Sequence, residues 1–336
     1  MHLSEEFISQ MNQLGRERTA FLFLIDYEME KPLIRKLEDL SPEEFEFEVD
    51  DGFLALDNHV RSKPKELETL QIATDPISFE RYRNAFDFVK GNILFGNSFL
   101  ANLTVETPIE LNWSLDDLYR FSKAKYKLHF KDRFLCFSPE TFVQIDGEGK
   151  IASFPMKGTI ELNEQAAYQQ ILGDAKELYE HTTIVDLIRN DLSKVAQKVW
   201  VERFRFVDEI QRQGRPPLLQ VSSEICGQLE SRWPEQIGDI FNAMLPAGSI
   251  TGAPKPKTTE IISTAEKTTY LEKKRGYYSG VFGVFDGQCL SSSVLIRFIE
   301  NRQGNLFFKS GGGITSRSSA EKEYQEVLSK IYVPLF

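Results

Sequence analysis

A carboxylate at Glu140 and an amine at Lys157 flank a segment with the pattern of a β-hairpin. Residues 142–145 and 151–154 are short apolar runs, and the turn between them contains two glycines. Because a hairpin brings its two ends side by side, we expect the two charged side chains to lie close together. An acid and an amine that face one small space could carry out proton transfer and covalent chemistry. The alternative is a salt bridge on the surface of the hairpin, and the segment by itself favours that alternative, since most charge pairs are structural.

Two pairs of glutamates occur at helical spacing and could supply metal ligands. Glu177 and Glu180 lie in the longest helical stretch, and Glu323 and Glu326 lie in another near the C-terminus, with Lys330 one turn further along the same face. Side chains three positions apart share a face of a helix. Carboxylate oxygens are the ligands that Mg²⁺ prefers. For either pair taken alone, a solvated helix face is the more common explanation.

Two glycine-containing segments have residue types that suit an anion. The first is a loop at 247–255, and the second is a glycine run that follows a predicted strand. Hydroxyls and exposed backbone N–H groups in such segments can bind a carboxylate. An ordinary loop and a flexible turn are the alternative explanations. The residues concerned are Ser249, Thr251, Gly252, Gly311, Gly312 and Gly313. In addition, Arg297 ends an apolar run, where a guanidinium usually has a carboxylate partner from the protein or a ligand.

Hydrophobic periodicity places these residues on an irregular succession of helices and strands. Apolar and charged residues alternate at 45–49, which predicts a half-exposed strand. The centre of 19–27 is uniformly apolar, which predicts a buried strand. Because strands and helices do not alternate regularly, we predict an α+β fold rather than a doubly wound sheet. Helices are predicted at 5–17, 78–91, 163–198, 237–244 and 258–265, with a short one after Ser114. Strands are predicted at 19–27, 45–49, 95–104, 126–137, 199–207, 218–225 and 292–297, and loops at 60–70 and 211–217.

The composition excludes some partners. The 336 residues include 40 Lys and Arg against 50 Asp and Glu, a formal net charge of −10, which argues against binding to nucleic acid or an anionic membrane. No apolar run is long enough to span a bilayer. The three cysteines, Cys136, Cys226 and Cys289, are scattered without metal spacing and suit a reducing environment. With no signal sequence at the acidic N-terminus, we expect a cytoplasmic protein.

The segment 138–159 resembles a known family. Residues 138–140, S-P-E, are similar to a family motif, and residues 155–159, P-M-K-G-T, resemble the P-I-K-G-T motif of aminodeoxychorismate synthase component I. That family belongs to the chorismate-utilising enzymes, together with anthranilate, isochorismate and salicylate synthases. The resemblance implies that Glu140 is a general acid. It also implies that Lys157, where most relatives have a small residue, is the position that distinguishes the activities.

Longer matches lie further along the chain. Residues 180–192 resemble E-H-x-x-x-V-D-L-x-R-N-D-L, residues 248–255 resemble G-S-I-T-G-A-P-K, and residues 275–280 resemble R-G-x-Y-x-G. The family implies an Mg²⁺ site of glutamates that holds the carboxylate of chorismate, next to a substrate pocket. The metal residues would be Glu177, Glu180, Glu323 and Glu326. The pocket residues would be Ser249, Thr251, Gly252, Tyr278, Arg297, Gly311, Gly312, Gly313 and Lys330.

The resemblance also implies a fold. Residues 1–336 would form one large domain, with two antiparallel β-sheets packed as a sandwich and helices outside. Residues 81–336 would be its catalytic core. Residues 1–80 would be a shortened N-terminal part, in which we expect much of the tryptophan-binding region of longer relatives to be missing.

The implied activity is the conversion of chorismate and ammonia to 4-amino-4-deoxychorismate, on the route to 4-aminobenzoate and folate, through an intermediate linked to Lys157. None of the cysteines sits in the glycine-flanked elbow of a glutaminase, so ammonia is expected from a separate glutaminase subunit. Leu100 stands where isochorismate and salicylate synthases carry a lysine that activates water, and an aliphatic side chain cannot do so. The alternatives are an anthranilate or isochorismate synthase-like enzyme and, from another class, a non-catalytic chorismate-binding protein.

Overall fold

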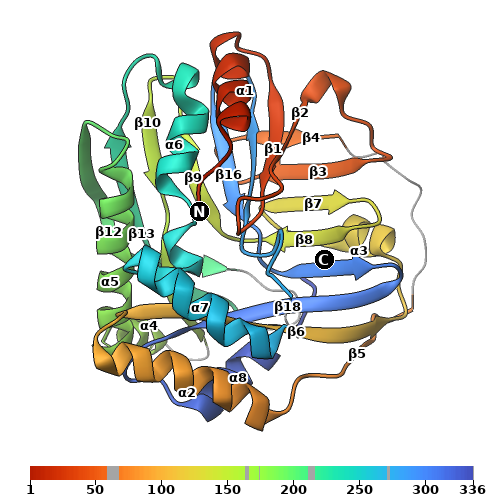
Figure 1. The fold of residues 1–336 in the computed structure, drawn as a ribbon, viewed down its shortest axis with the longest axis vertical. Helices are drawn as coiled ribbons and strands as arrows, with labels where there is room; N and C mark the ends of the chain where they lie inside the picture. The colour runs from red at the N-terminus through yellow and green to blue at the C-terminus, as the bar shows by residue number, and fades with distance from the viewer. Residues whose placement is uncertain (59–67, 163–165, 174, 211–215, 271–272, 336) are drawn as a thin grey trace.

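The computed structural model describes the chain except for residues 59–67, 163–165, 174, 211–215, 271–272 and 336. Within the described residues, the strands form two antiparallel sheets of nine strands each, packed against each other and flanked by helices. In Figure 1 the strands of the first sheet run roughly upright, and those of the second run across the view. The predicted α+β class, with two antiparallel sheets and helices outside, is confirmed.

The first sheet has the strand order β11-β13-β10-β9-β16-β15-β1-β2, and β12 also pairs with β13. Because β1 pairs with β15, distant parts of the chain share this sheet. Its strands are β1 (Phe21–Ile25), β2 (Leu33–Lys36), β9 (Thr141–Ile145), β10 (Lys150–Ser153), β11 (Met156–Glu161), β12 (Lys198–Ile210), β13 (Leu218–Gln228), β15 (Val281–Phe285) and β16 (Leu290–Val294).

The second sheet has the order β14-β6-β18-β17-β8-β7-β3-β4, and β5 also pairs with β6. β18 pairs with β17 only as far as Lys309 but with β6 as far as Ile314, so its last residues have a described sheet neighbour on one side alone. The strands are β3 (Phe45–Asp50), β4 (Ala55–Asp57), β5 (Ile72–Thr74), β6 (Leu100–Leu111), β7 (Tyr126–Phe130), β8 (Phe134–Ser138), β14 (Gly252–Ala253), β17 (Phe298–Arg302) and β18 (Asn305–Ile314).

The helices lie on the outer faces of the sheets (Figure 1). Ser78 and Ser114 are N-caps, as predicted: each side chain accepts a hydrogen bond from a backbone N–H in the first turn. No described helix has both the length and the apolar character needed to cross a membrane. The α-helices are α1 (Glu5–Arg16), α2 (Phe79–Phe95), α3 (Leu115–Phe121), α4 (Ala166–Gly173), α5 (Ala175–Leu192), α6 (Ile237–Met244), α7 (Lys255–Thr269) and α8 (Ala320–Ser329). The 3₁₀ turns are η1 (Leu37–Asp39), η2 (Trp233–Gln236) and η3 (Gly248–Ile250).

The buried strand β1 shows how the core is divided. Leu22 and Leu24 belong to the apolar cluster between the two sheets, whereas Phe21, Phe23 and Ile25 belong to the cluster that α1 and α6 cover. A strand that is apolar at every position can be buried on both faces. The prediction of a buried strand here is therefore confirmed.

The strand β3 differs from its prediction. Alternation at 45–49 predicted a half-exposed strand, but Glu46 is only 5% exposed. Lys131 and His129 lie against its carboxylate, and Asp116 of α3 joins them. The polar face is covered by charged partners, which alternation in the sequence does not reveal.

Three further expectations about elements are corrected. The single helix predicted at 163–198 is two helices, α4 and α5, and the second ends at Leu192. The glycine run lies inside β18, paired with β6, and does not follow the strand. β16 ends at Val294, so Arg297 lies beyond it with a left-handed backbone (φ 54°). The loops predicted at 60–70 and 211–217 fall mostly outside the described residues.

Candidate active site

The predicted hairpin is present and is closed by a tight turn. β9 and β10 pair antiparallel, and Asp146 Oδ1 accepts hydrogen bonds from the backbone N–H groups of Glu148 and Lys150, each at 2.9 Å. An aspartate that bonds to backbone two and four residues ahead fixes such a turn. Glu140 directly precedes β9 and Lys157 follows β10, so both residues leave the hairpin at its open end.

Glu140 is positioned through its backbone. The buried Ser138 hydroxyl donates to the carbonyl of Val294 at 2.6 Å and accepts from the Glu140 N–H at 3.2 Å. The Val294 N–H in turn donates to the Glu140 carbonyl at 3.2 Å. These bonds fix the acid to the end of β16. The serine of the S-P-E motif therefore has a positioning role that the sequence did not reveal.

Lys157 lies on a β-bulge. The register of β11 against β13 shifts between Met156 and Thr159, so that Lys157 and Gly158 stand opposite a single residue. Gly158 has a φ of 82°, a conformation that favours glycine. The structure describes the backbone of Lys157 and not its side chain. Bulges bend a strand and re-aim the side chains beside them, and they are frequent next to active sites.

Glu177 lies beside this bulge. A Cβ atom on Gly158 would stand 3.2 Å from Glu177 Oε2. The helix α5 therefore brings a carboxylate to the residue that follows Lys157. Glu177 therefore lies beside the backbone of β11 at Gly158, one helical turn before Glu180.

Glu323 and Glu326 of α8 face the glycine run of β18. A Cβ atom on Gly312 would stand 3.5 Å from Glu323 Oε2 and 3.7 Å from Glu326 Oε1, and Glu323 is 5% exposed. Lys330 Nζ lies 2.7 Å from Glu326 Oε1 and donates to the carbonyl of Gly311 at 2.8 Å. An ammonium has three N–H donors, so Lys330 keeps donor capacity for a ligand. The bare backbone at Gly312 keeps open the space in front of two carboxylates.

Glu180 is the buried acid of α5, with 9% of its surface exposed. Tyr179, the residue before Glu180, contacts the segment that leads into α8. The guanidinium of Arg317 in that segment lies 5.4 Å from the centroid of the Tyr179 ring. Buried carboxylates are costly unless a cation or hydrogen-bond donors compensate them. Carboxylate oxygens, which both helices offer, are the ligand type that Mg²⁺ prefers.

The loop at 249–252 is fixed to β6. The Asn102 N–H donates to the Thr251 carbonyl at 2.9 Å, and Gly252 continues the pairing. Gly252 has a φ of 117°, and a Cβ atom there would stand 1.8 Å from the carbonyl oxygen of Leu100, so only glycine fits. Thr251 is fully buried and Ser249 is half-buried. Leu100 is itself buried at the start of β6.

Tyr278 and Arg297 are neighbours near the same end of the sheets. Burial raises the pKa of Tyr278, although the charges of Arg275 and Arg297 act in the opposite direction. The phenol therefore stays neutral at ordinary pH and can donate a hydrogen bond. Arg297 stacks 4.9 Å from the ring of Tyr332, and its Nε is buried with no hydrogen-bond partner among the described residues. A guanidinium N–H in this state is suited to an anionic ligand.

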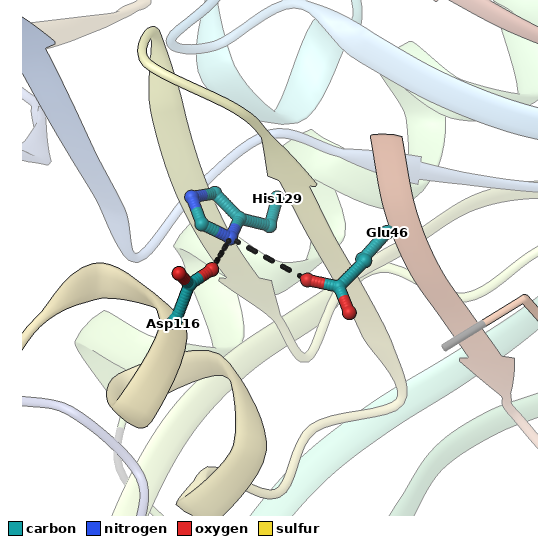
Figure 2. Close-up of side chains that lie close together, drawn as sticks. All are labelled: Glu46, Asp116 and His129. Carbon is teal, nitrogen blue, oxygen red and sulfur yellow. Dashed lines mark ion pairs between the residues drawn. The ribbon is translucent and has the colours of Figure 1, made fainter. Parts of the chain in front are cut away.

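A group of side chains with metal-ligand spacing lies away from the predicted metal residues. Among the described residues, Glu46, Asp116 and His129 offer ligand atoms that all lie within 4.8 Å of one another (Figure 2). None of the four predicted metal residues belongs to this group. Lys131 Nζ contacts both carboxylates, so an ammonium of the chain already pairs with them and offsets one of their two negative charges. Burial and the charge of Lys131 lower the pKa of His129 to about 4. We interpret this group as an internal ion network.

A groove of about 850 Å³ lies along α5, between that helix, β12 and the start of α7. Phe99, Tyr179 and Phe204 line it, and the buried pair of Asp191 and Lys255 contributes to it, with Lys255 Nζ 2.5 Å from Asp191 Oδ2. Burial lowers the pKa of Lys255 to about 8, against the effect of Asp191. The groove includes none of the predicted site residues.

A family model described as chorismate binding enzyme matches residues 4–335. The chain therefore belongs to the family of chorismate-utilising enzymes, in agreement with its motifs and its two-sheet fold. This finding covers nearly the whole chain and leaves open which reaction of the family it performs.

The relatives include a protein of similar length and longer synthases. An uncharacterized PabA-like protein of Haemophilus influenzae is 47% identical over 98% of this chain and 97% of its own length. Aminodeoxychorismate synthase component 1 of Bacillus subtilis is 28% identical over 81% of this chain and 58% of its own length. Anthranilate synthase component 1 of Arthrobacter globiformis is 33% identical over 76% of this chain and 49% of its own length.

Solved structures of the family share the fold. Anthranilate synthase component I from Streptococcus pneumoniae superimposes with a TM-score of 0.65 and 25% identity, over 80% of this chain and 60% of that chain. MenF, the menaquinone-specific isochorismate synthase from Escherichia coli, superimposes with a TM-score of 0.70 and 16% identity, over 97% of this chain and 80% of that chain. The second likeness concerns the fold alone.

Two residues with close contacts to the predicted site escaped sequence reasoning. Ser138 was noted only as part of a motif, and Arg275 only as the first letter of R-G-x-Y-x-G. Arg275 is 1% exposed and is hydrogen-bonded to Glu266 and to two backbone carbonyls. The arginine at a motif position was the available signal, but its partners lie far away in the sequence.

Proposed function

We propose that this chain is the chorismate-aminating component of an aminodeoxychorismate synthase. The observation that carries the proposal is Lys157 in P-M-K-G-T, on a bulge at the same end of the hairpin as Glu140. The resemblance of this segment to the family implies that most relatives have a small residue in place of the lysine. The proposed amination at C4 requires a nucleophilic amine and an acid. Reactions in which water or ammonia adds directly to the ring do not require the amine.

In the proposed mechanism, the neutral amine of Lys157 forms a bond to C2 of the chorismate ring while the bond from C4 to its hydroxyl breaks. Glu140 gives its proton to the departing hydroxyl, which leaves as water. Ammonia then bonds to C4 as the bond between C2 and Lys157 breaks, and the ring double bonds return to their positions. The Glu140 carboxylate takes back a proton from the new ammonium group. Chorismate and ammonia thus become 4-amino-4-deoxychorismate and water, and both side chains are regenerated.

The remaining residues would bind and orient the substrate. Mg²⁺ held by the four glutamates of α5 and α8 would neutralise a carboxylate of chorismate. Arg297, Tyr278 and the backbone of the two glycine segments offer donors to anionic oxygens of the substrate. The substrate residues are Ser249, Thr251, Gly252, Gly311, Gly312, Gly313 and Lys330, and the metal residues are Glu177, Glu180, Glu323 and Glu326.

Ammonia would come from a separate glutaminase subunit. None of the three cysteines has the lowered pKa of an activated nucleophile: Cys136 and Cys226 are buried, Cys289 is partly buried, and burial raises the pKa of each thiol. The PabA-like name of the Haemophilus influenzae relative also fits such a partner. Free ammonium should support the reaction without it.

Anthranilate synthesis is the second candidate. The percentage identity to anthranilate synthase component 1 of Arthrobacter globiformis, 33% over 76% of this chain, is higher than that to aminodeoxychorismate synthase component 1 of Bacillus subtilis, 28% over 81% of this chain. Overall identity at this level reflects the shared fold more than the chemistry. The residue at position 157 bears directly on the reaction, and it favours amination at C4.

Product analysis tests the proposal. The purified chain is mixed with chorismate, Mg²⁺ and ammonium at mildly basic pH, and the products are separated and identified by mass. We expect 4-amino-4-deoxychorismate. Anthranilate or isochorismate as the product would overturn the proposed activity, and so would no turnover of chorismate in the presence of both ammonium and an added glutaminase subunit.

A further inference from the structure

We infer that Arg275 and Glu266 are positioning residues that together hold both glycine segments of the substrate pocket in place. The inference rests on the proposed function only in taking these segments as the substrate-binding ones. Arg275 is 1% exposed and Glu266 is 5% exposed, and the hydrogen bonds of both side chains go to other groups of the chain. Their effect on binding would therefore act through the backbone that they hold.

The two side chains form a bidentate ion pair. Arg275 Nε donates to Glu266 Oε2 at 2.8 Å, and Arg275 Nη2 donates to Glu266 Oε1 at 2.6 Å. Glu266 belongs to α7, and Arg275 opens the motif that leads to Tyr278. Two parallel N–H···O bonds define the orientation of both groups, which a single bond does not.

The remaining donors of Arg275 hold backbone. Nη1 donates to the carbonyl of Ile250 at 3.0 Å, and Nη2 donates to the carbonyl of Asn102 at 2.6 Å. Ile250 lies between Ser249 and Thr251, in the loop proposed to bind the substrate. One guanidinium therefore fixes this loop to β6 and to α7 at the same time.

Glu266 extends the same connection to the second glycine segment. Its Oε1 accepts from both the N–H and the hydroxyl of Thr104, at 2.9 and 2.7 Å. Thr104 and Asn102 are the β6 residues that pair with Gly311 and Gly313. Since the end of β18 has a described sheet neighbour only in β6, the placement of the glycine run depends on this stretch of β6.

Lysine could not replace arginine in this position. A guanidinium has five N–H donors in a rigid plane, whereas an ammonium is a point charge with three. Arg275 uses four hydrogen bonds that point to three different elements. The variant Arg275→Lys keeps the charge but loses the geometry, and it is therefore the sharpest probe of positioning.

The simpler explanation is an ion pair that only stabilises the fold, and the chain contains a matched control for it. Lys127 is also buried, lies 2.8 Å from Glu48 Oε2, and donates to the carbonyls of Tyr119 and Ser122 at 3.1 and 3.2 Å. This is likewise a buried cation that holds one carboxylate and two backbone carbonyls. It lies on β7, toward the far edge of the second sheet from the pocket segments.

The experiment compares Arg275→Lys and Glu266→Gln with Lys127→Met and Glu48→Gln. Hydrogen exchange of the substrate-free chain is measured in peptides that cover 249–252 and 310–314, alongside chorismate affinity and stability in urea. For Arg275→Lys and Glu266→Gln only, we expect faster exchange in both segments. In the same two variants, the dissociation constant and KM for chorismate should increase by about 10-fold or more, with a smaller change in kcat. The control variants should lose stability without these effects.

Should a single variant of the pair fail to fold, the double variant Arg275→Met with Glu266→Leu removes both charges, which buried pairs often tolerate. It should still show faster exchange and weaker chorismate binding. The inference is overturned if exchange and chorismate affinity in these variants match those of control variants of equal stability. The exchange measurement needs no substrate, so this inference and the proposed activity can fail independently.

Discussion

Two groups of acidic side chains occupy different regions of this chain and differ in what faces them. Glu46 and Asp116 face the ring of His129 (Figure 2), and the ammonium of Lys131 contacts both carboxylates. Glu177 and Glu323 face glycine backbone, at Gly158 and Gly312. The first group has metal-like spacing and a lysine in contact with both carboxylates, whereas the second borders glycine backbone and has Lys330 beside Glu326 at 2.7 Å. Residue types and spacing alone do not reveal this difference.

The difference teaches that a site depends on the neighbours of the charged groups. Glycine opposite an acid leaves room for a ligand, and lysine opposite an acid takes up that room. The same contrast holds for lysines: Lys131 is enclosed by carboxylates, whereas Lys157 lies on a bulge next to a glycine with positive φ. Three sets of substitutions test this contrast, in order of expected effect.

The largest effect is expected at Lys157. Lys157→Ala removes the proposed nucleophile and should lower kcat for chorismate with ammonium by about 10³-fold or more. Lys150→Ala is the matched control, because Lys150 lies on the same hairpin with 38% of its side chain exposed, and it should stay within about twofold. Both are measured by product formation in ammonium. A Lys157→Ala variant that keeps more than a tenth of the rate would refute the role of the amine.

The dependence of activity on Mg²⁺ should change when a carboxylate of α8 is removed and should not change when Glu46 is replaced. Glu323→Gln, and likewise Gly312→Ala, which would place a Cβ 3.5 Å from Glu323 Oε2, should raise the Mg²⁺ concentration for half-maximal activity by about 10- to 100-fold. Glu46→Gln should leave that concentration unchanged, because Lys131 already pairs with both carboxylates of this group. Magnesium titration of activity measures all three variants. Equal effects of Glu46→Gln and Glu323→Gln would remove the distinction between the two groups.

The smallest effect concerns His129 and stability. Its folded pKa of about 4 lies below its ordinary value of 6.5, so the unfolded chain binds more protons between these pH values. Stability should therefore fall as the pH falls from about 6.5 toward 4, by about 1–3 kcal/mol through this residue. His129→Gln should reduce that fall without changing kcat at neutral pH. The free energy of unfolding is measured by urea denaturation at pH 7 and pH 4.5 for both chains. The same pH dependence in His129→Gln as in the unaltered chain would contradict this prediction.

Much of the fold was accessible to sequence reasoning. The strand β1, the hairpin of β9 and β10, and the helices capped by Ser78 and Ser114 follow from local patterns of apolar, glycine and capping residues. The candidate acid and amine could be named because short motifs surround them. Their proximity was inferred from hairpin geometry, which depends only on residues between them.

Other features depended on partners far away in the chain. The burial of Glu46 comes from Lys131 and Asp116, and the pairing of the glycine run comes from β6, some two hundred positions earlier. Arg275 carried a motif signal, but nothing local shows that its guanidinium holds Ile250 and Asn102. Periodicity reports which face of an element is apolar and does not report which charges will meet it.

The sequence by itself determined the elements that local propensity and capping specify, the family motifs, and the residues able to act as acid, amine and carboxylate ligands. Tertiary structure alone decided which carboxylates face a cation of the chain and which face glycine backbone. The physical reason is that electrostatic pairing depends on distances of a few ångströms between side chains of different elements. Those distances are set only when the two sheets and their helices pack together.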